Sequence, residues 1–241
     1  MPDTRSHRGP HPEDLDLFAG AAWPALQAAE ADLAWLLSRG YAGTSALKLV
    51  GDRMQLSERQ RLAVMRSACS DKALMHRRSL RVPAEQLAGN RLDLDGFNVL
   101  TSVEAALAGG VILAGRDGCY RDMASMHGSY RKVSETRPAL LLVGEVLQDL
   151  SVAECCWYLD RPVSNCGRLK TVIGQIAAER CWPWQALLAG DVDTVLVQSS
   201  AVVASADSGV LDRCRRWCNL AYEVIQRRIP AANVVPMCGP R

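Results

Sequence analysis

The stretch that decides the fold is residues 92–98, which read LDLDGFN. It is a short apolar run that closes on Asp95, and Gly96 follows at once as a turn residue. Short apolar runs bounded by turn residues are typical of buried strands. We therefore expect a strand over residues 92–95 whose last side chain is a carboxylate.

Downstream of this stretch, short apolar runs alternate with helical patterns. The pattern predicts strands at residues 111–114, 155–159 and 233–236, and helices at residues 139–150, 168–178 and 212–225. The apolar runs 194–197 and 202–205 either compete for one sheet position or occupy two. Strands separated by helices require crossover connections, so the fold class is α/β with a mainly parallel sheet and flanking helices.

Upstream of it, residues 1–88 show only helical periodicity. Apolar residues from Leu15 to Leu36 recur every three or four positions, with Pro24 as a kink or restart and Gly40 as the end. Further helices are expected at residues 44–50, from Ser57 and at residues 72–80, and the run from Ser57 to Gln60 matches a capping box. The expected organisation is a helical domain at residues 1–88 and an α/β domain at residues 89–241.

Composition excludes several classes of protein. The chain has 241 residues, 49% of them hydrophobic and 22% charged, which is typical of a globular protein. No run reaches the roughly 18 apolar residues of a membrane helix, and the polar first residues are not those of a secretory signal, so we expect a cytoplasmic protein with no membrane contact. The nine cysteines form no CxxC pair, which favours reduced, buried thiols over disulfides or zinc.

Positive charge is concentrated in one helical segment. The formal net charge is only +2, yet residues 53–81 hold eight Lys or Arg against two acidic residues. Such a segment fits a phosphate backbone, and the alternative is a solvated helix face whose arginine stems cover apolar surface.

Three expected strands end in an aspartate: Asp95, Asp160 and Asp207. If the strands are parallel neighbours, these carboxylates converge at one edge of the sheet, where ligands bind in open α/β folds. Clustered carboxylates repel one another unless a divalent cation such as Mg²⁺ or Mn²⁺ neutralises them. The alternative for each aspartate is a cap on the following helix.

These residues also carry a resemblance. The run from Asp95 to Asn98 resembles the opening motif of PIN-like (NYN-type) nucleases, and residues 204–212 are similar to a later strand end of that family. Over nearly its whole length, including residues 45–53 and 159–165, the chain resembles an uncharacterised prokaryotic family made of the domains of unknown function 434 and 5616. The resemblance to PIN-like nucleases rests on fewer residues.

The resemblance implies roles for particular side chains. Asp95 and Asp207 would bind metal, Asn98 would orient Asp95 or the attacking water, and Glu104 would present a further carboxylate. With the extra strand-end acid, the predicted catalytic residues are Asp95, Asn98, Glu104, Asp160 and Asp207, of which Asp95, Asp160 and Asp207 hold the Mg²⁺ or Mn²⁺. The roles of Asp117, Asp122, His127 and Asp212 stay open.

Nucleic acid is the expected partner. The predicted contacts are Arg53, Arg59, Arg61 and Arg66 in the basic segment, and Arg161, Arg168 and Lys170 at a helix start whose free amides favour an anion. Arg131 and Lys132 beside His127 could also hold a phosphate, or belong to a loop that ends a helix.

The predicted function is metal-dependent hydrolysis of phosphodiester bonds, with RNA favoured over DNA, by a PIN-like ribonuclease. A homodimer is left open. One alternative is a haloacid-dehalogenase-like phosphatase, in which Asp93 is the nucleophile and Asp95 the acid/base of a DxDG motif. The other is a nucleic-acid-binding protein without turnover. Asp93 separates the two enzymes, because only the phosphatase needs it.

Overall fold

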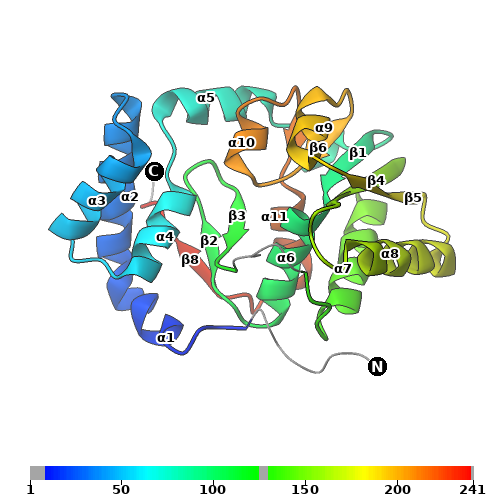
Figure 1. Cartoon of the computed structure of the whole chain (residues 1–241), viewed down its shortest axis with the longest axis horizontal. Helices are drawn as coiled ribbons and strands as arrows, with labels where there is room; N and C mark the ends of the chain where they lie inside the picture. The colour runs from blue at the N-terminus through cyan, green and yellow to red at the C-terminus, as the bar shows by residue number, and fades with distance from the viewer. Residues whose placement is uncertain (1–8, 125–129, 240–241) are drawn as a thin grey trace.

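The computed structural model describes residues 9–124 and 130–239, and within them the centre of the fold is a five-stranded parallel sheet (Figure 1). Its order is β5-β4-β1-β6-β7, where the strands are β1 (Arg91–Asp95), β4 (Glu154–Asp160), β5 (Trp184–Ala189), β6 (Val202–Ala204) and β7 (Trp217–Cys218). All four strand pairings in this sheet are parallel. The expected α/β class is confirmed.

Helices cover both faces of this sheet. One face packs against α6 (Gly96–Leu107), α7 (Thr136–Asp149), α8 (Cys166–Arg180) and α11 (Leu220–Arg228). The other face packs against the shorter α9 (Val192–Gln198) and α10 (Ser208–Leu211). In β1, Leu92 and Leu94 enter the core beneath α6, so the alternate residues Asp93 and Asp95 face the side of α9.

A second, three-stranded sheet joins the two halves of the chain. It consists of β2 (Ile112–Ala114), β3 (Tyr120–Asp122) and β8 (Val234–Pro236) in the order β3-β2-β8, and it lies between the N-terminal helices and the larger sheet (Figure 1). The strands expected at residues 111–114 and 233–236 therefore exist, but they belong to this sheet.

The N-terminal helices are α1 (Asp14–Leu17), α2 (Trp23–Ser38), α3 (Gly43–Arg53), α4 (Glu58–Ser67) and α5 (Asp71–Leu80), with short 3-10 turns at Gly20–Ala22 and Ala84–Gln86. The expected capping box opens α4: Ser57 Oγ accepts from the Gln60 amide at 3.3 Å. Pro24 stands in the first turn of α2, where its missing N–H costs nothing, instead of kinking a longer helix. The apolar core of these helices includes Val111, Leu113, Val235 and Met237 of the second part of the chain.

One expected helix was wrong: residues 212–225 divide into a loop, β7 and α11. Of the runs at residues 194–197 and 202–205, only the second holds a strand, β6, and the first belongs to α9. Strand β5 was missed, because its residues Trp184–Ala189 lack the β-branched side chains that mark strands, and because one side of it has no neighbour in the sheet. Its pairing with β4 is a tertiary contact.

The sequence predicted no membrane helix and no disulfides. None of the helices in the described residues has both the length and the apolar character needed to cross a membrane. All nine cysteines are in the described part of the chain as free thiols.

Candidate functional site

A cleft of about 450 Å³ opens at the carboxyl edge of the larger sheet. The chain leaves β1 for β4 on one side and returns after β5 to β6 on the other side, so the strand order reverses beside β1. In open α/β sheets this reversal is the place where ligands bind. Acidic and amide side chains line the cleft with two arginines: Asp95, Asn98, Asp122, Asp160, Asp193, Asp207, Arg66 and Arg121.

Asp95 lies deepest among the strand-end acids and is only 7% exposed. Its carboxylate accepts hydrogen bonds from Ser205 Oγ at 2.8 Å and from the Asn98 amide at 3.3 Å, the latter as the cap of α6. Burial raises the pKa of Asp95 to about 7; the two hydrogen bonds act against this, and the carboxylates of Asp207 and Asp160 add to it. The negative form of Asp95 is thus poorly stabilised by the protein itself.

Gly96 sets the approach of α6 to the sheet. A Cβ atom at this position would lie 2.7 Å from the backbone oxygen of Tyr158 in the neighbouring strand β4. Glycine is therefore required for α6 to start directly at the end of β1, and this explains why Gly96 follows Asp95 in the sequence.

Asp207 and Asn98 are tied to Asp95 through the loop after β6. Asn98 Oδ1 accepts from the Ala206 amide at 2.9 Å, and the Asp207 amide donates to Ser205 Oγ at 3.0 Å. Asp207 Oδ1 caps α10 by accepting from two amides, at 2.7 and 3.1 Å. Within the described residues Oδ2 accepts no hydrogen bond, so Asp207 is a helix cap that also presents an oxygen to the cleft.

Asp160 and Asp193 add two carboxylates to the cleft. Asp160 ends β4 and is half-buried, and burial raises its pKa. Asp193 lies in the first turn of α9; burial raises its pKa, and the charges of Asp207 and Asp160 raise it further. Asp193 was not among the predicted metal ligands, because β5, the strand before it, was not identified.

The donors suit a hard cation, but they do not form a closed cage. Among the residues that the structure describes, no three His, Cys, Asp or Glu side chains are grouped closely enough to hold a metal ion by themselves. A cation in this cleft would therefore complete its coordination with water or with substrate oxygens, which is the usual behaviour of Mg²⁺.

The residues that line the cleft lie within two segments that match known protein families. The family model described as "Domain of unknown function (DUF5616)" matches residues 84–223, which include all the acidic residues of the cleft. This chain belongs to the DUF5616 family. A second model, described as "Protein of unknown function (DUF434)", matches residues 25–79, the region of α2 to α5.

The DUF5616 chain also resembles the "Uncharacterized protein MJ0935" of Methanocaldococcus jannaschii. The two are 29% identical over 186 residues, which are 77% of this chain and 88% of that protein. No solved structure matches. The two-part family is thus shown, whereas neither description mentions a nuclease, and the PIN-like resemblance stays a hypothesis.

Glu104 of this DUF5616 protein does not line the cleft, which corrects its expected position. It is fully buried, and its Oε1 accepts from Tyr130 Oη and from Thr136 Oγ1, both at 2.6 Å. Six residues separate it from Asn98, and at about 100° per residue it projects some 240° around the helix from that side chain. The helical geometry therefore directs Glu104 toward α7 and not toward the strand end.

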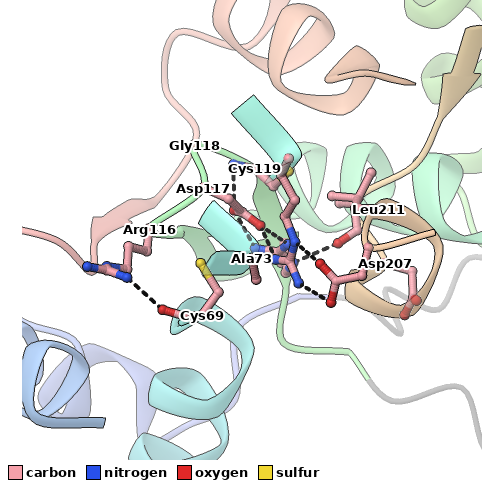
Figure 2. A network of polar contacts seen from close by, with 12 residues as sticks. Cys69, Ala73, Arg116, Asp117, Gly118, Cys119, Asp207 and Leu211 are labelled. Carbon is pink, nitrogen blue, oxygen red and sulfur yellow. Dashed lines mark hydrogen bonds and ion pairs between the residues drawn. The ribbon is translucent and has the colours of Figure 1, made fainter. Parts of the chain in front are cut away.

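Three acids with open roles can now be placed. Asp117 accepts from Arg77 and from Arg121, each at 2.6 Å, and its Oδ1 accepts from the Cys119 amide at 3.1 Å (Figure 2). Burial disfavours its charged form, but Arg121 and Arg77 outweigh burial and hold the pKa of Asp117 well below its usual value. Arg77 also pairs with Asp212 at 2.7 Å. Asp117 is thus the buried centre of an ion network with the exposed Asp212 at its edge, and neither carboxylate lines the cleft.

Asp122, by contrast, lines the cleft. Its carboxylate accepts from Ser102 Oγ at 2.9 Å, Thr101 Oγ1 at 3.2 Å and the Ala124 amide at 2.7 Å. These neutral donors fix its orientation. His127, the other residue with an open role, lies outside the described residues.

The predicted nucleic-acid contacts of the basic segment are mostly engaged within the chain. Arg53 pairs with Asp32, Arg59 with Asp14, and Arg61 with Asp52. Because these pairs already compensate the charges, the segment is less available to phosphate than its composition indicates. Arg66 lines the cleft; it donates to the backbone oxygens of Asp122 and Ala124 at 2.6 and 3.2 Å, and it pairs loosely with the Asp122 carboxylate at 3.9 Å.

The second predicted basic group lies beyond β4. Arg161, Arg168 and Lys170 are exposed, and within the described part of the chain none of them forms an ion pair. Among the described residues, the Arg161 guanidinium donates only to the Leu188 backbone oxygen, at 3.5 Å. Their predicted contact with nucleic acid remains a prediction.

Proposed function

We propose that this DUF5616 protein hydrolyses phosphodiester bonds of nucleic acid, RNA in preference to DNA, with Mg²⁺ or Mn²⁺ bound in the acidic cleft. The observation that carries the proposal is the convergence of Asp95, Asp160, Asp193 and Asp207 on one cleft at the reversal of strand order. None of the four forms an ion pair with a cationic side chain of the described residues. Uncompensated carboxylates in one place favour a bound cation.

The residues fit a magnesium-like ion held by few protein ligands. Asp95 and Asp207 are the best pair, since Ser205 Oγ bridges them by donating to the Asp95 carboxylate and accepting from the Asp207 amide. Mg²⁺ commonly takes one or two carboxylates and keeps several waters. When bound, such an ion polarises a phosphoryl oxygen and lowers the pKa of an attacking water.

The chain's own side chains would prepare the cleft for this chemistry. Ser205 holds one oxygen of Asp95, and the Asn98 amide holds the other. Asn98 Oδ1 in turn anchors the loop that carries Asp207. Arg66 lines the cleft and donates to two carbonyl oxygens, and its Nη1 lies 3.9 Å from Asp122 Oδ1, which offsets part of its positive charge. Its guanidinium is in a position to contact a phosphate that enters the same cleft.

The geometry does not favour the phosphatase alternative. Asp93, its nucleophile, lines a different cavity from the one that contains Asp95. Its carboxylate accepts from Ser199 Oγ at 2.7 Å and from Arg91 Nε at 3.1 Å. A nucleophile that is paired in this way and separated from its acid/base does not suit that mechanism.

The test is cleavage of a labelled single-stranded RNA in Mn²⁺, measured with purified wild type and variants. Asp95→Asn and Asp207→Asn should each lower the rate by about 100-fold or more, because each removes a charge that acts on the cation. Asp93→Asn is the matched control: it neutralises a buried aspartate of the same strand and should leave the rate unchanged.

Three outcomes would contradict the proposal. Native rates in Asp95→Asn and Asp207→Asn would remove the assigned roles. Loss of activity in Asp93→Asn, with a folded protein by circular dichroism, would favour the phosphatase. Wild type that binds RNA or DNA but cleaves neither would favour a binding protein without turnover.

A further inference from the structure

A second cavity, of about 250 Å³, lies beside the start of α8. Arg131, Lys132 and Arg168 line it on one side, and Tyr130, Leu169 and Val172 contribute apolar surface. Neither Arg131 nor Lys132 is near Arg168 in sequence, so the fold alone brings these three cations together.

The three cations are exposed, and they form no ion pair within the described part of the chain. Arg53, Arg59 and Arg77, by contrast, each have an aspartate partner. Three like charges around a small cavity repel one another, and an anion placed among them relieves that repulsion. The cavity therefore has the electrostatics of an anion site.

The cavity lies directly beside the acidic cleft. Phe97 lines the cleft and Tyr130 lines the cavity, and the centres of their rings are 5.3 Å apart. Two hydrogen bonds join the segment of Tyr130 to the start of α8. Asn165 Nδ2 donates to the Tyr130 backbone oxygen at 2.9 Å, and the Tyr130 backbone amide donates to the Ser164 backbone oxygen at 3.1 Å. These bonds fix the backbone beside Arg131 and Arg168 next to the proposed site of hydrolysis.

We propose that this cavity binds the terminal phosphate of a nucleic-acid strand, a phosphate monoester, whose chain then leads into the acidic cleft. A monoester carries about −1.5 to −2 charge at neutral pH, against −1 for an internal diester, and so matches three cations better. The apolar side formed by Leu169 and Val172 suits the sugar or base of the end nucleotide. The inference rests on the proposed function for the nature of the substrate.

The experiment is calorimetric titration without divalent cations, so that neither metal binding nor turnover contributes. Adenosine 5′-monophosphate and adenosine 3′-monophosphate are compared with adenosine. At least one monophosphate should bind about 10-fold or more tightly than adenosine, and the stronger one identifies the strand end. Arg168→Ala and Arg131→Ala should each weaken that binding about 10-fold.

Arg78→Ala is the matched control, because Arg78 is an exposed arginine of α5 that lines neither cavity and has no ion pair in the described chain. It removes the same charge and should leave the affinity unchanged. Equal affinity for adenosine and both monophosphates, or an equal loss in Arg78→Ala, would overturn the proposal. Because Asp95→Asn is tested by cleavage and Arg168→Ala by binding, either proposal can fail while the other stands.

Discussion

Asp95 and Asp117 are two aspartates of the same α/β part, buried to nearly the same extent, and they differ in every other respect. Asp117 is 5% exposed and Asp95 is 7% exposed. Arg77 and Arg121 hold the pKa of Asp117 well below its usual value, whereas burial raises the pKa of Asp95 to about 7. Asp117 has two cationic partners, whereas the donors to Asp95 among the described residues are the neutral groups of Ser205 and Asn98.

Burial of a charge therefore does not distinguish a structural carboxylate from one in a functional site, whereas the type of partner does. The ion network around Asp117 links α5 to the loop before β3, and Arg121 Nε extends it to the Ala206 oxygen at 2.8 Å. The network is thus complete without a ligand and supports the wall of the cleft. The cleft around Asp95 is electrostatically incomplete, which is what a cation site requires.

The largest effect on stability should come from removing Asp117 from its ion network with Arg77 and Arg121. Asp117→Ala leaves Arg77 and Arg121 buried without their shared partner, which should lower the free energy of unfolding by about 3–5 kcal/mol. Urea unfolding followed by circular dichroism measures it. Asp32→Ala, which breaks the exposed pair with Arg53, is the control and should cost under about 1 kcal/mol. Equal costs for the two variants would remove the structural role of the network.

The raised pKa of Asp95 should make the free energy of unfolding depend on pH. Because its pKa is about 7 in the folded protein against 3.8 unfolded, the folded state keeps a proton that the unfolded state releases. This contribution to stability is present below pH 4 and is lost as the pH rises through 7. The loss amounts to about 4 kcal/mol at about 1.4 kcal/mol per pH unit.

Unfolding in urea with a metal chelator, at pH 5 and pH 8, tests this dependence. Asp95→Asn cannot titrate, so it should lose less stability than the wild type between these two values. Parallel pH dependence in wild type and Asp95→Asn would show that Asp95 is already ionised at pH 5 and would end the contrast with Asp117.

Addition of metal should give a smaller effect. At 100 times its dissociation constant, Mn²⁺ should stabilise the wild type by about 2.7 kcal/mol, and less at pH 6 than at pH 8 because protons compete for Asp95. Thermal unfolding measures the shift. Asp207→Asn should reduce it, and Asp93→Asn should keep it. A shift that survives in Asp95→Asn and Asp207→Asn together would place the cation elsewhere.

Much of the fold could be predicted because it depends on local patterns. The strand ending at Asp95, the capping box at Ser57 and the alternation of strands with helices are all written in neighbouring residues. The same patterns placed Asp95, Asp160 and Asp207 at strand ends, and the structure brings these three to one cleft. β5 was missed because its side chains carry a weak strand signal and its place is set by pairing with β4.

The errors within the candidate site have the same cause. Asp193 was overlooked with the strand that precedes it, and Glu104 was expected at the cleft although the turn of α6 directs it into the core. In both cases the residue type was suitable, and the position depended on packing.

By itself the sequence determined most of the segments that form helices and strands, and three of the strand ends that carry an acid, because propensity, capping and periodicity act over a few residues. Only the tertiary structure decided which charges are paired. Arg59 pairs with Asp14 across 45 residues, and Arg77 pairs with Asp212 across 135. Electrostatic energy depends on distance through space, so charges that look alike along the chain became a completed network in one place and an open anionic cleft in another.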